Sequence, residues 1–133
     1  MRYARRQNSL RSLKAKAWQL FSILVRKGGA DKAGKAACVT CGVKRPWKEM
    51  QAGHFLSRVH LSILFDRRNV SVQCPRCNGP LRGNLVNYTL WMQKTYGQKV
   101  IDELLDLKRE SVKFSRSDYQ EMIEQFGKEI EGL

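Results

Sequence analysis

The side chains best suited to chemistry in this chain are four cysteines, arranged in two Cys-x-x-Cys pairs with 32 residues between them. The pairs are Cys38/Cys41 and Cys74/Cys77. Four thiolates in two tight pairs supply the whole tetrahedral ligand set of a structural zinc ion, which then has no open position for water. Because a redox dithiol needs only one pair, the spacing predicts Zn²⁺ in a structural role.

A Gly-His dipeptide lies between the two pairs, in the segment Ala52-Gly53-His54-Phe55. An imidazole at the end of a predicted strand in a basic chain can accept a proton from a water that attacks a phosphodiester. A lone histidine is also commonly a structural or surface residue. The sequence therefore makes His54 the candidate general base and leaves the structural role open.

Two asparagines accompany this histidine. Asn69 stands at the start of a predicted strand, where its amide can hold a loop by hydrogen bonds to the backbone and so fix the imidazole. Asn78 follows Cys77 directly, and its amide oxygen is a ligand that Mg²⁺ accepts. A turn asparagine and a helix-capping asparagine are the alternative interpretations of these positions.

The distribution of charge indicates a polyanionic partner. Of the net charge of +13, residues 1–100 contribute +17 (20 Lys/Arg against 3 Asp/Glu) and residues 101–133 contribute −4 (5 against 9). Phosphate contacts from basic side chains give affinity without sequence information, and nothing here resembles a base-reading helix. DNA is the expected partner, bound through a group of arginines: Arg58, Arg67, Arg68, Arg76 and Arg82.

Hydrophobic periodicity places these residues on elements. A helix is expected from Asn8 or Ser9 to the Gly28-Gly29 pair, with Ser9 as N-cap, after a basic segment (residues 1–8) that we expect to be frayed. The segment that holds the candidate site is expected to contain a flexible loop (28–37), a strand (47–56), a basic loop (57–68), a second strand (69–73) and a short helix opened by Cys74.

Two or three amphipathic helices are expected after residue 85, the last with a capping box formed by Ser117 and Gln120. The 133 residues are one domain, with a basic N-terminal helix (1–29), a zinc-bound core (38–84) and a C-terminal helical extension (85–133). The paired cysteines, the absence of an apolar signal sequence and the absence of any apolar run near about 18 residues predict a soluble intracellular protein without a membrane segment.

Taken together, these features resemble the HNH, or ββα-metal (His-Me finger), nucleases. More narrowly, they are similar to the lambdoid phage NinG (Rap) recombination endonucleases. The likeness runs from about Trp18 to Phe126 and is densest from Cys38 to Tyr88. It is carried by Ala52-Gly-His-Phe, Phe65-Asp-Arg-Arg-Asn-Val, Gln73-Cys-Pro-Arg-Cys-Asn78, and Arg82-Gly-Asn84 with Tyr88.

The resemblance implies a mostly helical α+β fold, in which a zinc-bound, treble-clef-like ββα-metal core lies between flanking helices. It implies hydrolysis of DNA phosphodiesters with Mg²⁺ or Mn²⁺, and a preference for branched DNA such as Holliday junctions or D-loops. His54 would activate the water, Asn78 would bind the catalytic ion, and Asn69 would support the loop and His54. The protein would be encoded by a phage or prophage and act in the cytoplasm of the bacterial host.

The sequence departs from the wider HNH pattern at one position. Many HNH enzymes have an aspartate directly before the catalytic histidine, whereas this chain has Gly53. A carboxylate from elsewhere is therefore expected, and the acids between Cys38 and Cys77 are Glu49 and Asp66. Asp66 is the favoured ligand, and a salt bridge in solvent is its alternative role.

Two rival functions remain at the level of sequence. One is an HNH nicking or restriction-type endonuclease without branch selectivity. The other is a non-catalytic, zinc-stabilised module that only binds DNA. Because resolving a four-way junction takes two cuts, a homodimer is the expected assembly, with its interface on the acidic helices from Val100 onward.

Overall fold

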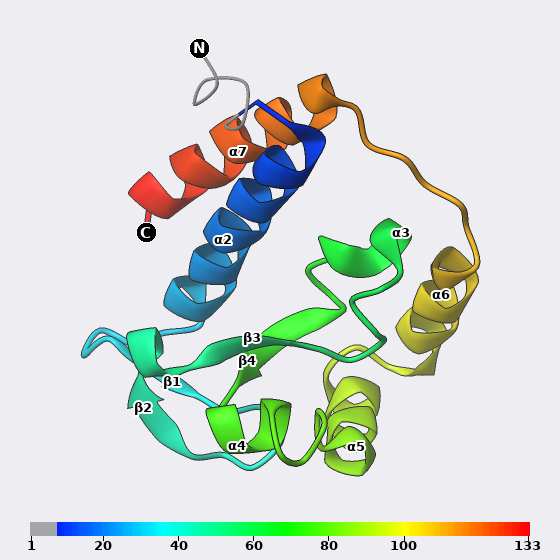
Figure 1. Cartoon of the computed structure of the whole chain (residues 1–133). Helices are drawn as coiled ribbons and strands as arrows, with labels where there is room; N and C mark the ends of the chain where they lie inside the picture. Colours follow the sequence, from blue (N-terminus) through cyan, green and yellow to red (C-terminus); the bar gives the residue numbers. More distant parts are fainter. Residues whose placement is uncertain (1–7) are drawn as a thin grey trace.

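The computed structural model describes residues 8–133, so the segment that we expected to be frayed (residues 1–8) lies, except for its last residue, outside the described part. The chain is a mostly helical α+β protein with small hairpins, as predicted (Figure 1). The elements in chain order are α2 (Leu10–Gly28), β1 (Lys35–Ala37), β2 (Lys44–Pro46), the 3-10 helix η1 (Trp47–Glu49), β3 (Gln51–His54), α3 (Leu61–Leu64), β4 (Val70–Gln73), α4 (Pro75–Asn78), α5 (Leu85–Thr95), α6 (Gln98–Lys108) and α7 (Arg116–Glu131).

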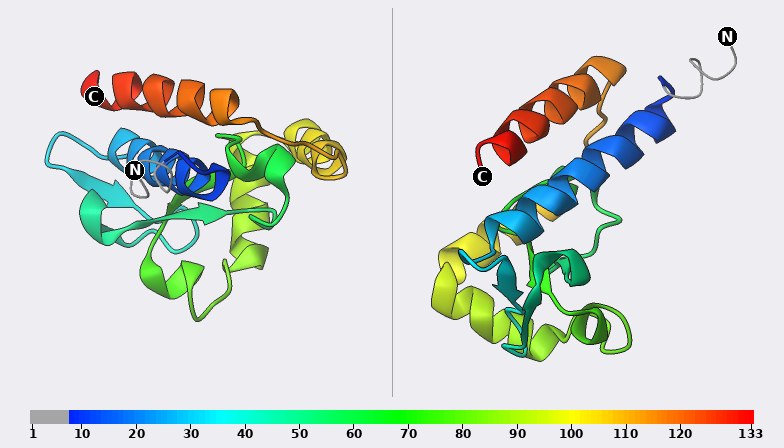
Figure 2. Two further views of the ribbon diagram at one scale, coloured as in Figure 1. Left: turned by 45° about the horizontal axis from the view of Figure 1, so that its top comes forward. Right: turned by 90° about the vertical axis from the view of Figure 1, so that its left-hand side faces the viewer.

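The long helix α2 begins and ends where its sequence predicts. The Ser9 hydroxyl accepts a hydrogen bond from the Ser12 N–H, which satisfies one of the free donors at the helix start. One face is buried through four residues at helical spacing: Leu13, Ala17, Phe21 and Leu24. Helix α7 packs along this face, with the rings of Phe21 and Phe126 5.2 Å apart, and the two helices lie side by side above the β3–β4 hairpin (Figures 1 and 2).

The central hairpin pairs β3 with β4 in antiparallel register, with Gln51 opposite Gln73 and His54 opposite Val70. The strand expected at 47–56 is shorter than predicted, because Trp47–Glu49 forms a 3-10 turn closed by the Met50 N–H on the Trp47 carbonyl at 3.1 Å. Pro46 fixes the backbone at the entry to that turn. This register places His54 at the last position of β3.

The loop expected at 28–37 contains a strand that the sequence did not predict. Lys35–Ala37 (β1) pairs with Lys44–Pro46 (β2), and the turn between the strands carries Cys38 and Cys41. Both strands have only three residues, and β2 is exposed throughout, so neither shows the alternation of apolar and polar residues that marks a strand.

Three helices complete the chain. The capping box of α7 is formed by Ser115 and Asp118, not by Ser117 and Gln120 as predicted. The Ser115 hydroxyl accepts from the Asp118 N–H at 3.1 Å, and the Asp118 carboxylate accepts from the Ser115 N–H at 2.8 Å. The prediction was wrong by two residues because Ser115 has the extended backbone that a cap requires.

The apolar stripes of α6 and α7 are buried within the chain. Ile101 and Leu104 of α6 pack in a cluster with Phe55, Ile63 and Tyr88. In α7, Tyr119 and Phe126 are buried in the clusters under α2. Within residues 8–133, none of the helices combines the length and the apolarity that crossing a bilayer requires.

Candidate metal centre and adjoining histidine site

The four cysteine thiols converge at one point. Their sulfur atoms all lie within 4.8 Å of one another, although the first pair comes from the β1–β2 turn and the second from the start of α4. All four are free of disulfides, and three of them are buried. A compact cluster of four sulfur ligands fits a tetrahedral zinc ion, as predicted from the spacing. Gly42, with a φ of +81°, takes the left-handed turn that folds the first pair inward.

Hydrogen bonds support the sulfur atoms from outside the cluster. The Thr40 hydroxyl lies 3.2 Å from the Cys38 sulfur, the Cys77 N–H donates to Cys74, and the Asn84 amide donates to Cys77 at 3.6 Å. Burial opposes ionisation of Cys38, yet bonds from the Thr40 hydroxyl and from backbone amides lower its pKa to about 6. Such contacts orient metal ligands and favour their thiolate form.

The segment 82–84 has three consecutive residues with positive φ: Arg82 (50°), Gly83 (93°) and Asn84 (47°). This conformation is costly for the two residues that have side chains. It turns the Asn84 amide onto the Cys77 sulfur and offers the Gly83 carbonyl to Gln73 at 2.9 Å. The Arg-Gly-Asn motif is therefore part of the support for the cysteine cluster.

His54 is held by a stacking contact on its ring and by a hydrogen bond at one nitrogen. Its Nε2 lies 3.2 Å from the Leu64 carbonyl oxygen. Because a carbonyl only accepts, Nε2 carries the proton and Nδ1 is the unprotonated nitrogen. The ring stacks on Trp18 with centroids 4.9 Å apart. Desolvation lowers the pKa of His54 to about 4, and the positive charge of Arg58 acts in the same direction.

Asn69 holds the loop after His54, as the sequence predicts. Its oxygen accepts from the Leu56 N–H at 2.8 Å, and its nitrogen donates to the carbonyls of Leu56 (3.0 Å) and Ile63 (3.3 Å). The side chain is fully buried. By bridging the two ends of the loop, Asn69 positions the neighbouring Leu64 carbonyl that binds His54.

Gln73 and Tyr88 are two further positioning residues that the sequence reasoning missed. The Tyr88 hydroxyl donates to the Gly53 carbonyl at 2.8 Å, directly before His54. The buried Gln73 amide nitrogen donates to the Thr40 hydroxyl and the Gly83 carbonyl, so it links the segments around the cysteine cluster to β4, the partner strand of β3. A Cβ at position 53 would lie 1.9 Å from the Gln73 Oε1. The fold therefore has no room for the aspartate that many HNH enzymes place there.

His54 and Asn78 line one hollow of about 440 Å³, together with Arg58 and Arg82. The Asn78 amide nitrogen donates to the Gln51 Oε1 at 2.8 Å, which leaves the amide oxygen as the group that can face a cation. The structure thus brings together the candidate base, the candidate ligand and two of the five predicted arginines. Arg76 is exposed on the neighbouring α4.

Asp66, Arg67 and Arg68 do not line this hollow. Both oxygens of Asp66 accept from the Arg68 guanidinium, whose other nitrogen contacts Glu103. Burial raises the pKa of Asp66, but the Arg68 side chain outweighs it and lowers the pKa overall. Asp66 thus forms an ion pair with Arg68, and it lines neither of the two hollows that Asn78 lines.

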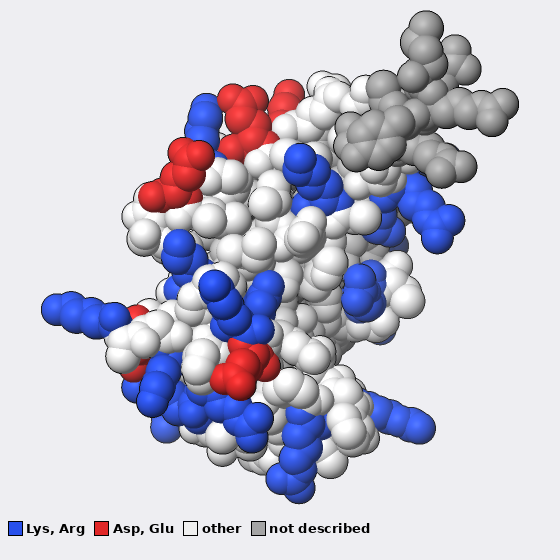
Figure 3. Space-filling model, turned by 60° about the vertical axis from the view of Figure 1, so that its left-hand side comes forward, with Lys and Arg blue, Asp and Glu red and all other residues white. Residues whose placement is uncertain are grey.

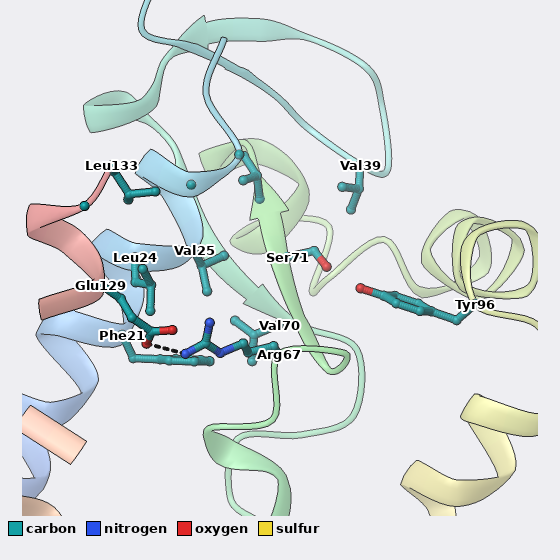
Figure 4. Close-up of a pocket in the computed structure, with 14 residues that line it drawn as sticks. Phe21, Leu24, Val25, Val39, Arg67, Val70, Ser71, Tyr96, Glu129 and Leu133 are labelled. Atoms are coloured by element: carbon teal, nitrogen blue, oxygen red, sulfur yellow. Dashed lines mark hydrogen bonds and ion pairs between the residues drawn. The ribbon is translucent and has the colours of Figure 1, made fainter. Parts of the chain in front are cut away.

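Another hollow, of about 540 Å³, involves β4 but no residue of β3 (Figure 4). Its walls are mainly apolar side chains of α2 and β4, including Phe21, Leu24 and Val70. Arg67 pairs with Glu129 of α7 at its edge. Neither His54 nor any cysteine lines it, so this hollow is separate from the candidate site.

The fold and the cysteine cluster define a small, mostly helical α+β protein built around a four-cysteine site suitable for zinc. The chain belongs to the phage lambda NinG family, whose model, described as "Bacteriophage Lambda NinG protein", matches residues 3–133.

Curated relatives that carry the name "Protein ninG" match parts of the chain. The chain is 35% identical over 68 residues to that of Escherichia phage 933W, and 34% identical over 68 residues to that of Escherichia phage lambda; each match covers 50% of this chain and 33% of the relative. It is 32% identical over 93 residues to that of Salmonella phage P22, which covers 65% of this chain and 45% of the relative. The matches thus span less than half of each relative. No solved structure matches the chain.

Proposed function

We propose that this NinG-family protein is a structure-selective DNA endonuclease that hydrolyses phosphodiesters of branched DNA, such as Holliday junctions or D-loops, with Mg²⁺ or Mn²⁺. The observation that carries the proposal is the hollow that His54, Asn78 and two arginines line together, close in the fold to a zinc-type cluster. A base, a candidate ion ligand and phosphate-binding cations are the groups that metal-assisted hydrolysis needs.

His54 acts as the general base. The Leu64 carbonyl holds its Nε2–H, so Nδ1 is free to take the proton of the attacking water. The imidazole is neutral near pH 7 and so able to accept a proton, and its pKa of about 4 makes it a weaker base than an ordinary histidine. Stacking on Trp18 fixes the ring plane. Arg58 and Arg82 bind the scissile phosphate and orient it toward the water.

The Asn78 amide oxygen would hold the divalent ion, and Gln51 orients that amide. The ion, when bound, supplies positive charge against the phosphate and the leaving oxygen. One neutral protein oxygen suffices where water and phosphate complete the shell of Mg²⁺. Of the two acids between the cysteine pairs, Glu49 shares a hollow with Asn78, whereas Asp66 is paired with Arg68. We therefore assign the expected carboxylate to Glu49 in place of Asp66.

The test compares a labelled four-way junction with a matched linear duplex, using the zinc-loaded protein with Mg²⁺ or Mn²⁺. We expect selective cutting of the junction. We expect His54→Ala to cut about 10²- to 10⁴-fold more slowly while binding the junction equally well, since general-base catalysis contributes about that much. Added imidazole should restore part of the cutting by His54→Ala, which a structural role for the ring would not allow.

The same experiment separates the rival functions. Equal cutting of junction and duplex would support an HNH nicking or restriction-type enzyme and contradict branch selectivity. Binding without cutting under both metals would leave a zinc-stabilised DNA-binding module and contradict catalysis. Glu49→Gln beside Asp66→Asn tests the carboxylate: the first should raise the Mg²⁺ concentration needed for half-maximal cutting, and the second should not.

We also propose that the protein is encoded by a phage or prophage and works in the cytoplasm of the bacterial host, where recombination intermediates arise. Membership of a phage protein family supports this part of the proposal.

A further inference from the structure

A second hollow, of about 430 Å³, adjoins the hollow of His54. The two have three lining residues in common: Ala52, Arg58 and Asn78. One wall of the second hollow is α2, which contributes Trp18, Ser22 and Arg26; another is the segment 48–51, which includes Lys48. A ligand that enters beside His54 therefore has a continuous path past Asn78 toward the C-terminal half of α2.

Three cations line this path, Arg26, Lys48 and Arg58, against one acid, Glu49. The Arg26 Nε donates to the backbone carbonyl and the hydroxyl of Ser22, both at 3.1 Å. Its guanidinium lies over the ring of Trp47, and the Lys48 ammonium lies near the same ring. These contacts hold the charges in place before any ligand arrives, which lowers the entropy that binding costs.

The three basic residues along this path lack the ion pairs that several other basic residues of the described chain form. Among the described residues, no ion pair involves Arg26, Lys48 or Arg58, whereas the arginines at 67 and 68 both pair with acids. Figure 3 shows a face on which Lys and Arg gather over the lower part, around smaller acidic patches, while a larger group of acids lies at the upper left. Unpaired, pre-positioned cations beside a hydrolytic site suit a polyanion.

We propose that the second hollow, called the groove below, binds the sugar-phosphate backbone of the cleaved strand on one side of the cut. Arg26 and Lys48 each contact a phosphate there. The inference rests on the proposed function only in taking the hollow of His54 as the position of the cut. The aromatic face of Trp18 is already covered by His54 and Arg58. The groove therefore holds the backbone and does not stack bases, so its binding is independent of base sequence.

The first test measures DNA affinity by fluorescence anisotropy without divalent ions, over a range of salt concentrations. We expect Arg26→Gln with Lys48→Gln to weaken binding by roughly tenfold and to flatten the slope of log K against log salt by about 2, about 1 for each lost phosphate contact. The matched control is Lys94→Gln with Lys99→Gln. It removes the same charge from exposed positions on α5 and α6 and should change the slope much less.

Two further variants keep the test informative if the double variant unfolds. Lys48 is exposed, so Lys48→Gln alone should fold and lose about half of the effect. Arg26→Lys keeps the charge and should retain most of the slope. If the groove variants give the same salt slope as the Lys94/Lys99 control, the groove does not bind phosphates, even if the protein cuts DNA. If the double variant flattens the slope of log K against log salt but the protein never cuts DNA, the proposed function is contradicted, whereas phosphate binding by the groove is supported.

A second experiment tests the side of the cut. Phosphates of the substrate strand are replaced one at a time by neutral methylphosphonates, and the affinity of the wild type is compared with that of Lys48→Gln. Lys48→Gln should weaken binding to every DNA except the one in which the phosphate that Lys48 contacts has been made neutral, because on that DNA the contact is already absent. That position should lie on one side of the cleavage site. An undiminished loss at all positions would contradict a specific phosphate contact.

Discussion

His54 illustrates how its surroundings, more than its residue type, decide what a histidine can do. Burial against Trp18 lowers its pKa to about 4, and the Leu64 carbonyl fixes its tautomer. Both effects leave a neutral imidazole near pH 7, with Nδ1 as the proton acceptor. The sequence offered the position between the cysteine pairs but could not show that a tryptophan from α2 covers the ring.

We predict that His54 titrates about two units below an ordinary histidine, with a midpoint near pH 4. The measurement is an NMR titration of the ring protons, with His54→Asn to assign the signals. A midpoint near 6.5 would contradict the burial seen here.

The same shift has a consequence for stability. The folded protein holds His54 neutral down to about pH 4, while the unfolded chain protonates it near 6.5, so the unfolded state binds more protons between these values. The contribution of this residue to the free energy of unfolding is therefore fully present above about pH 6.5 and is lost as the pH falls toward 4. His54→Asn should show a smaller fall than the wild type over this window, and zinc cancels from the comparison because both proteins bind it.

At position 53, the close approach of Gln73 dictates glycine. We predict that Gly53→Ala destabilises the fold by about 1–3 kcal/mol, because the added methyl would lie 1.9 Å from the buried Gln73 side chain, which could move only by breaking its bonds to Thr40 and Gly83. The control is Gly127→Ala in the middle of α7, where an added Cβ meets nothing within 4 Å. That change should stabilise the protein by about 0.5–1 kcal/mol. Chemical denaturation of both variants measures the difference, and similar effects of the two would contradict it.

At the scale of elements, the cysteine cluster joins segments that could not hold one another by themselves. Strands β1 and β2 have three residues each, and α4 has four. The turn after β1 and the start of α4 meet through the sulfur atoms. The Gln73 amide nitrogen, at the end of β4, donates to the Thr40 hydroxyl and to the Gly83 carbonyl, and β4 in turn pairs with β3, which carries His54.

We predict that the purified protein contains one zinc ion per chain and that a strong chelator lowers its free energy of unfolding by several kcal/mol, because metal binding is coupled to folding. The measurements are native mass spectrometry and urea denaturation with and without the chelator, with zinc restored as the control. Since α2 and α7 pack through their own apolar faces, part of the helical signal should survive chelation. An unchanged urea midpoint would contradict a structural zinc.

For the whole molecule, the structure separates the basic and acidic parts that the sequence contains. Acidic residues are concentrated on the C-terminal helices, and α7 lies against α2 at the end of the molecule away from the cysteine cluster (Figure 1). The hollow of His54 and the adjoining groove are lined mainly by basic and neutral residues. This separation lets a polyanion reach the candidate site without meeting the acidic face.

Homodimerisation stays a prediction. Most of the apolar side chains of α6 and α7, which we expected at the interface, pack inside the chain itself, and Leu105 is exposed. A dimer would need another surface, and α5 offers exposed apolar side chains at Leu85, Val86 and Leu90. We expect sedimentation velocity with junction DNA to show two protomers per junction, and Val86→Glu to weaken that assembly. A monomer at micromolar concentration, with and without DNA, would contradict it.

The sequence alone determined the features that depend on local spacing. Two Cys-x-x-Cys pairs specify their own metal chemistry, Ser9 and the glycine pair bound α2, and the alternation of residues 69–73 indicates β4, because caps, turns and periodicity act over a few residues. Contacts between distant segments were decided by the tertiary structure. Only the fold shows that Trp18 stacks on His54, that Gln73 excludes a side chain at position 53, and that Asp66 forms an ion pair with Arg68. The choice among several chemically suitable partners depends on which of them the packed chain brings within bonding distance.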